Sequence, residues 1–95
     1  MPAIVESGKH VIKGHIVDLS LNGAFMLLPD LPDPTRPVTL TLGLPGSQPL
    51  VLNAELVRVD IRLEGDGSSH QYGLAVRFLS LSSEQRLLLF NTLRI

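Results

Sequence analysis

The chain of 95 residues contains no cysteine and no tryptophan. Without cysteine it can form neither disulfide bonds nor thiolate metal sites. Aromatic residues make up only 4% of the chain, whereas 44% of its residues are hydrophobic, so the core must consist mainly of Leu, Val, Ile and Ala. This length and composition predict one globular domain that covers residues 1–95.

The chain also lacks an excess of charge of either sign, because its formal net charge is −1. A basic field that gathers a nucleic-acid polymer is therefore excluded, whereas a small anion could still be held by a local basic group. No apolar run is long enough to span a bilayer, and the first residues lack the charged-then-apolar order of a signal peptide. We therefore expect a soluble, cytoplasmic domain without membrane insertion.

Alternation of apolar and polar residues dominates the sequence. Residues 38–44, 50–61 and 71–78 place large apolar side chains at every second position, which is typical of strands with one buried face. Two further apolar segments, 11–17 and 23–28, predict two more strands. Five to six short strands at this spacing indicate a small antiparallel barrel or sandwich.

The period changes at the C-terminal end of the chain. Ser82 and Gln85 have the spacing of a helix capping box, and residues 83–94 contain neither Gly nor Pro. A broad apolar stripe runs along this segment, formed by Leu87, Leu88, Phe90 and Leu93. We expect a helix here that closes one end of the barrel or packs against its wall.

The hexapeptide Asp-Leu-Ser-Leu-Asn-Gly at residues 18–23 connects the strands expected over residues 11–17 and 23–28. The Asp18 carboxylate accepts hydrogen bonds, the Ser20 hydroxyl donates or accepts them, and Gly23 lets another molecule approach the backbone. Such a turn could hold the polar edge of a flat ligand. The same residues are also typical of a structural hairpin turn, because Asn-Gly favours hairpins and Asp and Ser often bond to nearby backbone groups. The residues alone leave both interpretations open.

Three features together carry a resemblance to a known family. They are the Asp-x-Ser-x-x-Gly motif followed by an apolar strand, the segment Tyr-Gly-Leu-Ala-Val-Arg-Phe at residues 72–78, and the terminal helix. Over residues 11–94 the chain resembles the PilZ domain. PilZ domains are bacterial six-stranded β-barrels, and many of them bind the second messenger cyclic di-GMP. The resemblance implies a mainly β protein, a small six-stranded antiparallel barrel with a C-terminal α-helix.

The resemblance also implies roles for the residues of the motif. In the family the Asp and the Ser help to hold a guanine, and the Gly lets the ligand lie close to the barrel wall. These ligand-binding roles would fall here on Asp18, Ser20 and Gly23, with Asn22 beside them in the same turn. The chemistry agrees, because the Watson–Crick edge of guanine carries N–H donors for which a carboxylate is a suitable acceptor.

One feature of the ligand-binding family members is missing from this sequence. Those members usually carry an Arg-x-x-x-Arg motif before the first strand, whose guanidinium groups hold the phosphates and the outer edges of the guanines. The first arginine here is Arg36, so we expect a variant that lacks this motif. Cyclic di-GMP carries two phosphodiester charges, and the loss of both guanidinium groups removes the strongest charge-assisted hydrogen bonds.

Three substitutes for the arginine pair follow from the sequence. Lys9 and Lys13 have the same spacing, but lysine is a point charge without a bidentate fork, and a solvated strand face is the alternative explanation. Arg58 lies on a later strand, where it could stack on a guanine or simply pair with Asp60 on the surface. The third source would be a basic arm in a longer native protein or in a partner.

Other chemistry has little support in the sequence. His10, His15 and His70 lack the spacing of a metal site, and Ser20 does not lie in a nucleophile elbow. No Gly-rich phosphate loop is followed by Lys and Ser or Thr. We therefore predict no catalytic residue, no metal site and no cofactor, with cyclic di-GMP as the suspected ligand.

These observations lead to two functional hypotheses. The first is a non-enzymatic bacterial signalling module that binds cyclic di-GMP and relays it to a protein partner in motility or biofilm control. The second is a PilZ-like protein–protein adaptor that has lost cyclic di-GMP binding.

Overall fold

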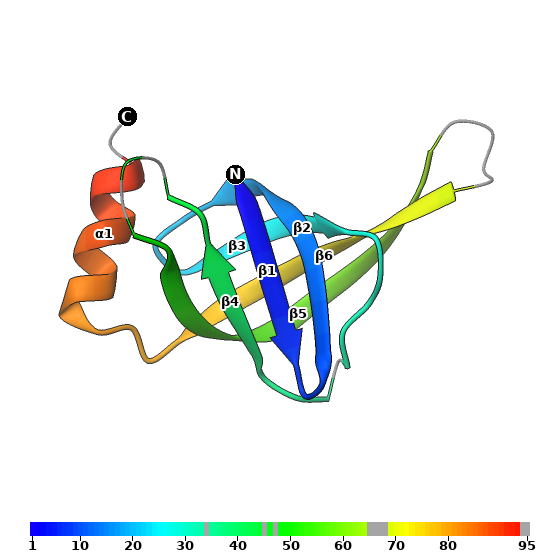
Figure 1. Ribbon diagram of the computed structural model, residues 1–95, viewed down its shortest axis with the longest axis horizontal. Coiled ribbons are helices and arrows are strands. Elements are labelled where there is room, and N and C mark those ends of the chain that lie inside the picture. The colour runs from blue at the N-terminus through cyan, green and yellow to red at the C-terminus, as the bar shows by residue number, and fades with distance from the viewer. Residues whose placement is uncertain (34, 45, 47, 65–68, 94–95) are drawn as a thin grey trace.

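The computed structural model describes residues 1–33, 35–44, 46, 48–64 and 69–93. Along this described chain, six strands close into one antiparallel barrel in the order β1-β2-β3-β6-β5-β4 (Figure 1). A single described helix follows them. The elements are β1 (Pro2–Ser7), β2 (His10–Leu19), β3 (Gly23–Leu28), β4 (Val38–Leu42), β5 (Leu50–Glu64), β6 (Ser69–Leu79) and α1 (Ser83–Leu93). The predicted six-stranded barrel with a C-terminal helix is confirmed.

Strand β1 is the element that the sequence analysis did not assign. It pairs with β2 on one side and with β4 on the other, and it thereby closes the barrel. Its buried residues Ala3, Val5 and Ser7 alternate with more exposed ones, but two of them are small, so their apolar signal is weak. Pro2 occupies the first position of the strand, where a residue without an N–H group is tolerated.

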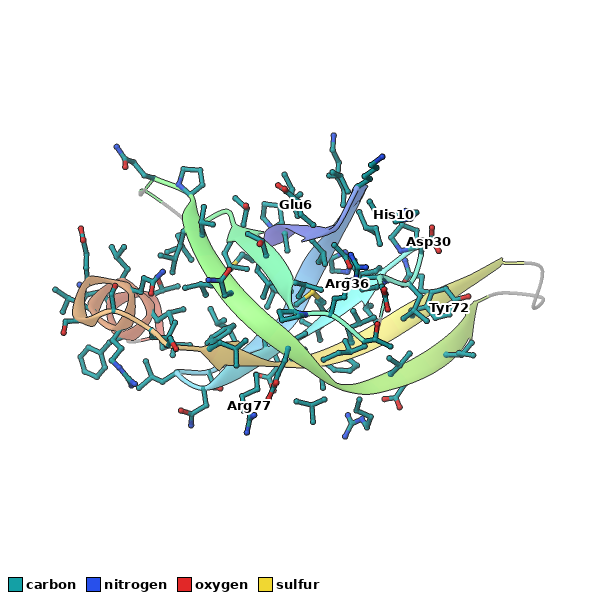
Figure 2. The ribbon with its side chains drawn as sticks, turned by 90° about the horizontal axis from the view of Figure 1, so that it is seen from below. Glu6, His10, Asp30, Arg36, Tyr72 and Arg77 are labelled. Carbon is teal, nitrogen blue, oxygen red and sulfur yellow. The ribbon has the colours of Figure 1, made fainter. Side chains whose placement is uncertain are left out.

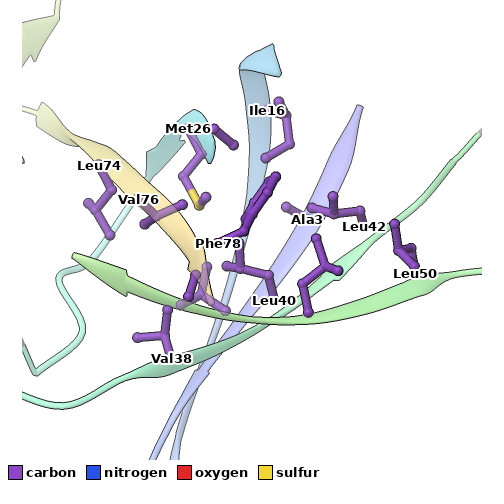
Figure 3. Packing of buried hydrophobic residues seen from close by; sticks show 14 of the residues in the cluster. Ala3, Ile16, Met26, Val38, Leu40, Leu42, Leu50, Leu74, Val76 and Phe78 are labelled. Atoms are coloured by element: carbon purple, nitrogen blue, oxygen red, sulfur yellow. The ribbon is translucent and has the colours of Figure 1, made fainter. Parts of the chain in front are cut away.

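The core of the barrel is formed by inward-facing aliphatic side chains. Each strand contributes alternate residues, as the period of two requires. Figure 3 shows Phe78 lying among aliphatic side chains from several strands. The largest fully buried side chains include Met26, Leu28, Leu40, Leu42, Leu52, Leu74 and Leu89. The predicted core of mainly aliphatic residues is thus confirmed.

Two strands carry a β-bulge, which changes the face of every residue after it. In β2, Ile16 pairs with Met26 and Asp18 with Phe25, so Val17 is the extra residue. In β5, Leu56 pairs with Val76 and Arg58 with Ala75, and an extra residue again lies between them. Uninterrupted alternation would place Asp18 on the inner face with Ile16, and Arg58 on the inner face with Leu56. The bulges turn both charged side chains to the outer face.

Helix α1 lies at one end of the barrel, opposite the projecting end of the β5–β6 hairpin (Figure 1). The predicted capping box is present: the Ser82 N–H donates to Gln85 Oε1 at 2.8 Å, and the Gln85 N–H donates to Ser82 Oγ at 3.1 Å. Gln85 Nε2 also donates to the carbonyl oxygen of Val51 in β5 at 2.9 Å. Leu89 is fully buried against the core. The helix therefore belongs to the folded unit of the barrel.

The ends of several predicted elements differ from the structure. The strand expected over residues 38–44 ends at Leu42, whereas β5 extends to Glu64 and β6 begins at Ser69. The last residue of the expected helix, Arg94, lies outside the described residues. No helix in the described ranges has the length and hydrophobicity that crossing a membrane requires.

Candidate functional site

Asp18 and Arg58 lie in one row across the outer face of four neighbouring strands. Because Phe25 pairs with both Asp18 and Ala75, and Ala75 pairs with Arg58, the row runs from β2 through β3 and β6 to β5. Three strand spacings separate its two ends, or about 14 Å. The structure therefore places the carboxylate and one of the expected basic residues on a common surface.

A second row lies next to the first and contains the motif glycine. Gly23 pairs with Arg77, and Arg77 pairs with Glu55. Between the turn and these rows lies an open hollow of about 340 Å³, which we call the motif hollow. It is lined by Asp18, Ser20, Asn22, Gly23, Ala24, Phe25, Val76 and Arg77. The four motif residues expected from the sequence thus lie together around one cavity.

The side chain of Ser20 holds the turn between β2 and β3. Its hydroxyl accepts hydrogen bonds from the N–H groups of Asn22 and Gly23 at 3.2 and 3.1 Å. It donates to the carbonyl oxygen of Gly23 at 3.2 Å. One donor and two acceptor positions exhaust the capacity of a hydroxyl. Ser20 therefore has a structural role here, and a direct ligand contact by its hydroxyl stays a prediction.

Asp18 differs from Ser20 because its carboxylate remains available. The residue is exposed, it lines the motif hollow, and it has neither a hydrogen-bond nor an ion-pair partner within the described part of the chain. An ionised carboxylate offers only acceptor positions. Asp18 is thus suited to bind a ligand edge that carries N–H donors.

The turn is attached to the barrel at two points. The carbonyl oxygen of Asn22 accepts a hydrogen bond from the N–H of Phe78 in β6 at 2.8 Å. At Gly23, an added Cβ atom would lie 2.2 Å from the carbonyl oxygen of Val76. The lack of a side chain at Gly23 is therefore required by the close approach of β3 and β6, independently of any ligand.

Arg58 and Arg77 each have an acidic partner. The Arg58 Nε atom lies 3.4 Å from the Asp60 carboxylate, which confirms the expected surface pair. Its guanidinium carbon also lies 6.0 Å from the centroid of the Phe25 ring, at the outer limit of a cation–π contact. Arg77 forms an ion pair with Glu55. All four side chains are substantially exposed, so each pair is screened by water.

The two lysines lie away from the motif. Lys9 is in the turn between β1 and β2, and the nine residues from Lys9 to Asp18 span roughly 30 Å of strand. Lys13 is an exposed residue of β2, where it pairs with Ile4, roughly 15 Å along the strand from Asp18. Neither lysine lines the motif hollow. The structure therefore does not bring the lysines together with the motif, and their contact with phosphate stays a prediction.

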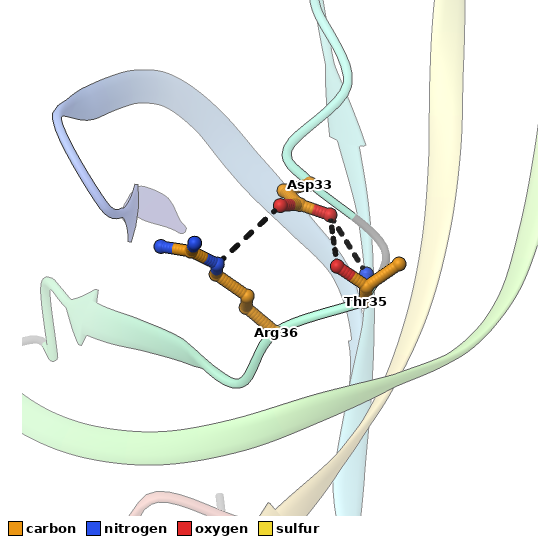
Figure 4. Close-up of polar contacts among 3 residues, drawn as sticks. All are labelled: Asp33, Thr35 and Arg36. Atoms are coloured by element: carbon orange, nitrogen blue, oxygen red, sulfur yellow. Dashed lines mark hydrogen bonds and ion pairs between the residues drawn. The ribbon is translucent and has the colours of Figure 1, made fainter.

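Lys9 instead borders a different hollow at the end of the β1–β2 hairpin, with His10, Asp33 and Arg36. Figure 4 shows that the Asp33 carboxylate accepts two hydrogen bonds from Thr35 and pairs with Arg36 at 3.6 Å. The hydrogen bond from the Thr35 hydroxyl is the main cause that lowers the pKa of Asp33 below its ordinary value of 3.8. Asp33 therefore stays ionised at neutral pH, and its partners favour the folded loop until the pH falls through this lowered pKa.

Arg77 is the residue of this site that the sequence analysis did not select. It lies in the segment 72–78 that carries the family resemblance, and the period of two already placed it on the outer face of its strand. Its position beside Gly23 depends on the pairing of β3 with β6, however, which connects residues about fifty positions apart in sequence. Figure 2 shows Arg77 pointing outward, on the side of the barrel opposite Glu6.

The described residues show no alternative chemistry for this surface. No group of three or more His, Asp or Glu side chains within the described ranges could hold a metal ion. Around the motif hollow, the described residues provide the Asp18 carboxylate, the Arg77 guanidinium group and a lining that includes Gly23, Ala24, Phe25 and Val76. Such a surface offers acceptor oxygens to N–H donors and a guanidinium group to a negatively charged group.

Comparison with known proteins defines the family. The model of the PilZ domain matches residues 1–93, which is nearly the whole chain. The chain therefore belongs to the PilZ domain family, whose members are binding and adaptor domains of cyclic di-GMP signalling without catalytic function of their own. Comparisons with curated proteins and with solved structures give no match.

Proposed function

We propose that this PilZ domain binds cyclic di-GMP on the outer face of β2, β3, β6 and β5. The bound state is relayed to a protein partner in the control of motility or biofilm formation. The observation that carries the proposal is the exposed carboxylate of Asp18, which lines the motif hollow and has no partner among the described residues. Family membership supplies the ligand class.

The side chains of this surface could contact both guanine bases of the ligand. The Asp18 carboxylate accepts hydrogen bonds from the N–H groups on the Watson–Crick edge of a guanine. Gly23 presents no side chain beside it, and Phe25, the direct cross-strand neighbour of Asp18, lines the same hollow and offers an aromatic ring to a flat base. Arg58 lies at the far end of the same row and offers a guanidinium plane on which a second base can stack.

Isothermal titration calorimetry with cyclic di-GMP tests the proposal. Asp18→Asn keeps the shape of the side chain but replaces one acceptor oxygen by a donor, and we expect it to weaken binding at least tenfold. Because Asp18 has no partner within the described residues, the thermal midpoint should change little. Glu6→Gln is the matched control, since it removes one exposed negative charge from the opposite side of the barrel (Figure 2).

One of two results would contradict the receptor hypothesis itself, and the other would contradict the proposed binding face. One is the absence of heat and of NMR shifts when the unmodified protein is titrated with cyclic di-GMP. The other is equal binding by the unmodified protein and the Asp18→Asn variant. The second result would place the ligand elsewhere on the barrel.

A specific observation also favours the adaptor hypothesis. The side chains of Leu21, Leu87 and Phe90 are 36%, 59% and 50% exposed, and with Ser83 and Arg86 they surround a hollow of about 350 Å³. An apolar patch of this kind is typical of a protein contact. Capture of partners from bacterial lysate with and without cyclic di-GMP separates the hypotheses: ligand-dependent capture favours the receptor, and ligand-independent capture favours the adaptor.

A further inference from the structure

We propose that Arg77 binds a phosphate of the ligand in the motif hollow, and that Glu55 lowers ligand affinity by competing for the same guanidinium group. This inference rests on the proposed function and names a residue and a regulating contact of that site. The competing group, Glu55, lies on β5, the strand that pairs with β6 beside Arg77.

Position is the first argument for Arg77. It is the direct cross-strand neighbour of Gly23, the last residue of the motif. It lines the motif hollow of about 340 Å³ and also an adjacent hollow of about 270 Å³ that it shares with Asn22 and Arg86. In the described part of the chain, it is the one arginine that borders the motif hollow.

The guanidinium group of Arg77 is also chemically suited to bind phosphate. The planar guanidinium group of arginine presents a fork of N–H donors that matches two phosphate oxygens, which lysine cannot do. Cyclic di-GMP brings two phosphodiester charges to a chain that has no arginine before Arg36. Arg77 places a guanidinium group next to the motif, and it does so from strand β6 and not from a segment before the first strand.

Glu55 already contacts one nitrogen of this guanidinium group. Its Oε1 atom pairs with Nη2 of Arg77, and the register of β5 against β6 places the two residues directly opposite each other. The side chains are 40% and 65% exposed. An exposed pair of this kind contributes little to stability, so a phosphate can displace the carboxylate. Among the described residues that line the two hollows with Arg77, Asp18 and Arg86 are the other charged ones.

Calorimetric titration of four proteins with cyclic di-GMP tests the inference: the unmodified protein, Glu55→Gln, Arg77→Gln and the double variant. Glu55→Gln removes the competing charge and should tighten binding by about two- to fivefold. Arg77→Gln should weaken it by roughly tenfold or more. Without Arg77 there is nothing for Glu55 to compete for, so the double variant should bind no more tightly than Arg77→Gln.

Asp33→Asn is the matched control. It also removes a carboxylate from an exposed arginine pair, but this pair lies at the end of the β1–β2 hairpin, so affinity should stay unchanged. The NMR signal of the Arg77 Nε–H group reports the contact directly, and it should shift on titration in the unmodified protein and in Glu55→Gln.

The outcomes separate this inference from the proposed function. If the unmodified protein binds cyclic di-GMP while Glu55→Gln and Arg77→Gln bind with the same affinity, the inference is overturned and the function stands. If Glu55→Gln and Asp33→Asn tighten binding equally, the effect is one of overall charge, and the inference is again overturned. If none of the proteins binds the ligand, the proposed function fails, and the role of Arg77 fails with it.

Discussion

At the scale of single residues, the motif divides into a part that builds the turn and a part that faces outward. Ser20 uses its hydroxyl within the turn, and Gly23 makes room for the backbone of β6. Asp18 is left with its carboxylate exposed and unpaired in the described chain. The structural interpretation is therefore confirmed for Ser20 and Gly23, whereas ligand binding by Asp18 stays a prediction.

This division leads to a prediction about Ser20. Ser20→Ala removes the hydroxyl that makes three hydrogen bonds in the turn, and it should lower the free energy of unfolding by about 1 kcal/mol. Ser20→Thr retains a hydroxyl and should lose less. Urea unfolding followed by circular dichroism measures both variants. An alanine variant as stable as the unmodified protein would show that the turn does not depend on this hydroxyl.

At the scale of elements, alternation revealed most of the strands but could not reveal the two bulges. The residues around each bulge are ordinary strand formers such as Ile16, Val17 and Leu56, so no local signal marks an extra residue. The pairing partners on β3 and β6 determine where the extra residue lies, and they are distant in sequence. For the same reason the sequence suggested Asp18 and Arg58 as separate candidates but did not place them in one row.

Helix α1 was predicted well because its signal is local. Ser82 and Gln85 lie three residues apart, and both of their capping hydrogen bonds are present. We predict that Ser82→Ala lowers the free energy of unfolding by about 1 kcal/mol, because it leaves an N–H group at the start of the helix without its acceptor. Denaturant unfolding measures the loss. Ser83→Ala, one residue further along, is the control and should change stability by no more than about 0.5 kcal/mol.

At the scale of the whole molecule, the helix and the barrel share one hydrophobic core. Leu89 is fully buried within the core cluster, whereas Leu87 on the same helix is 59% exposed. Leu89 was not part of the predicted stripe, whose residues Leu87, Phe90 and Leu93 are exposed, whereas Leu88 is partly buried against the core. The sequence pattern alone could not reveal which side chains are buried, because this depends on how the helix lies against β5.

The shared core leads to a prediction for these two leucines. Leu89→Ala should lower the free energy of unfolding by about 2–5 kcal/mol, because it removes buried apolar atoms and leaves a cavity. Leu87→Ala should change it by no more than about 0.5 kcal/mol. Thermal unfolding of the two variants makes the comparison. Similar losses for both would mean that the helix does not pack on the barrel through Leu89.

The closure of the barrel was the least predictable part of the fold. The class of fold followed from the alternation of apolar residues and from the family resemblance, and both can be recognised in the sequence itself. The order of the strands depends on β1, whose short segment with Ala3 and Val5 carries a weak apolar signal, and on pairings between distant segments. The position of Arg77 beside the motif depends on the same long-range pairings.

Because of the bulges at Val17 and Val57, the proposed binding surface depends on the number of residues in each strand as well as on their identity. Insertion of one further residue before Asp18 or Arg58, without a second bulge to accommodate it, would turn the following side chains of that strand into the barrel, although every residue of the motif would still be encoded. A search for the motif would continue to find such a gene intact. Surveys of this family that judge competence by signature residues should therefore also examine the spacing between each signature residue and the nearest core position of its strand.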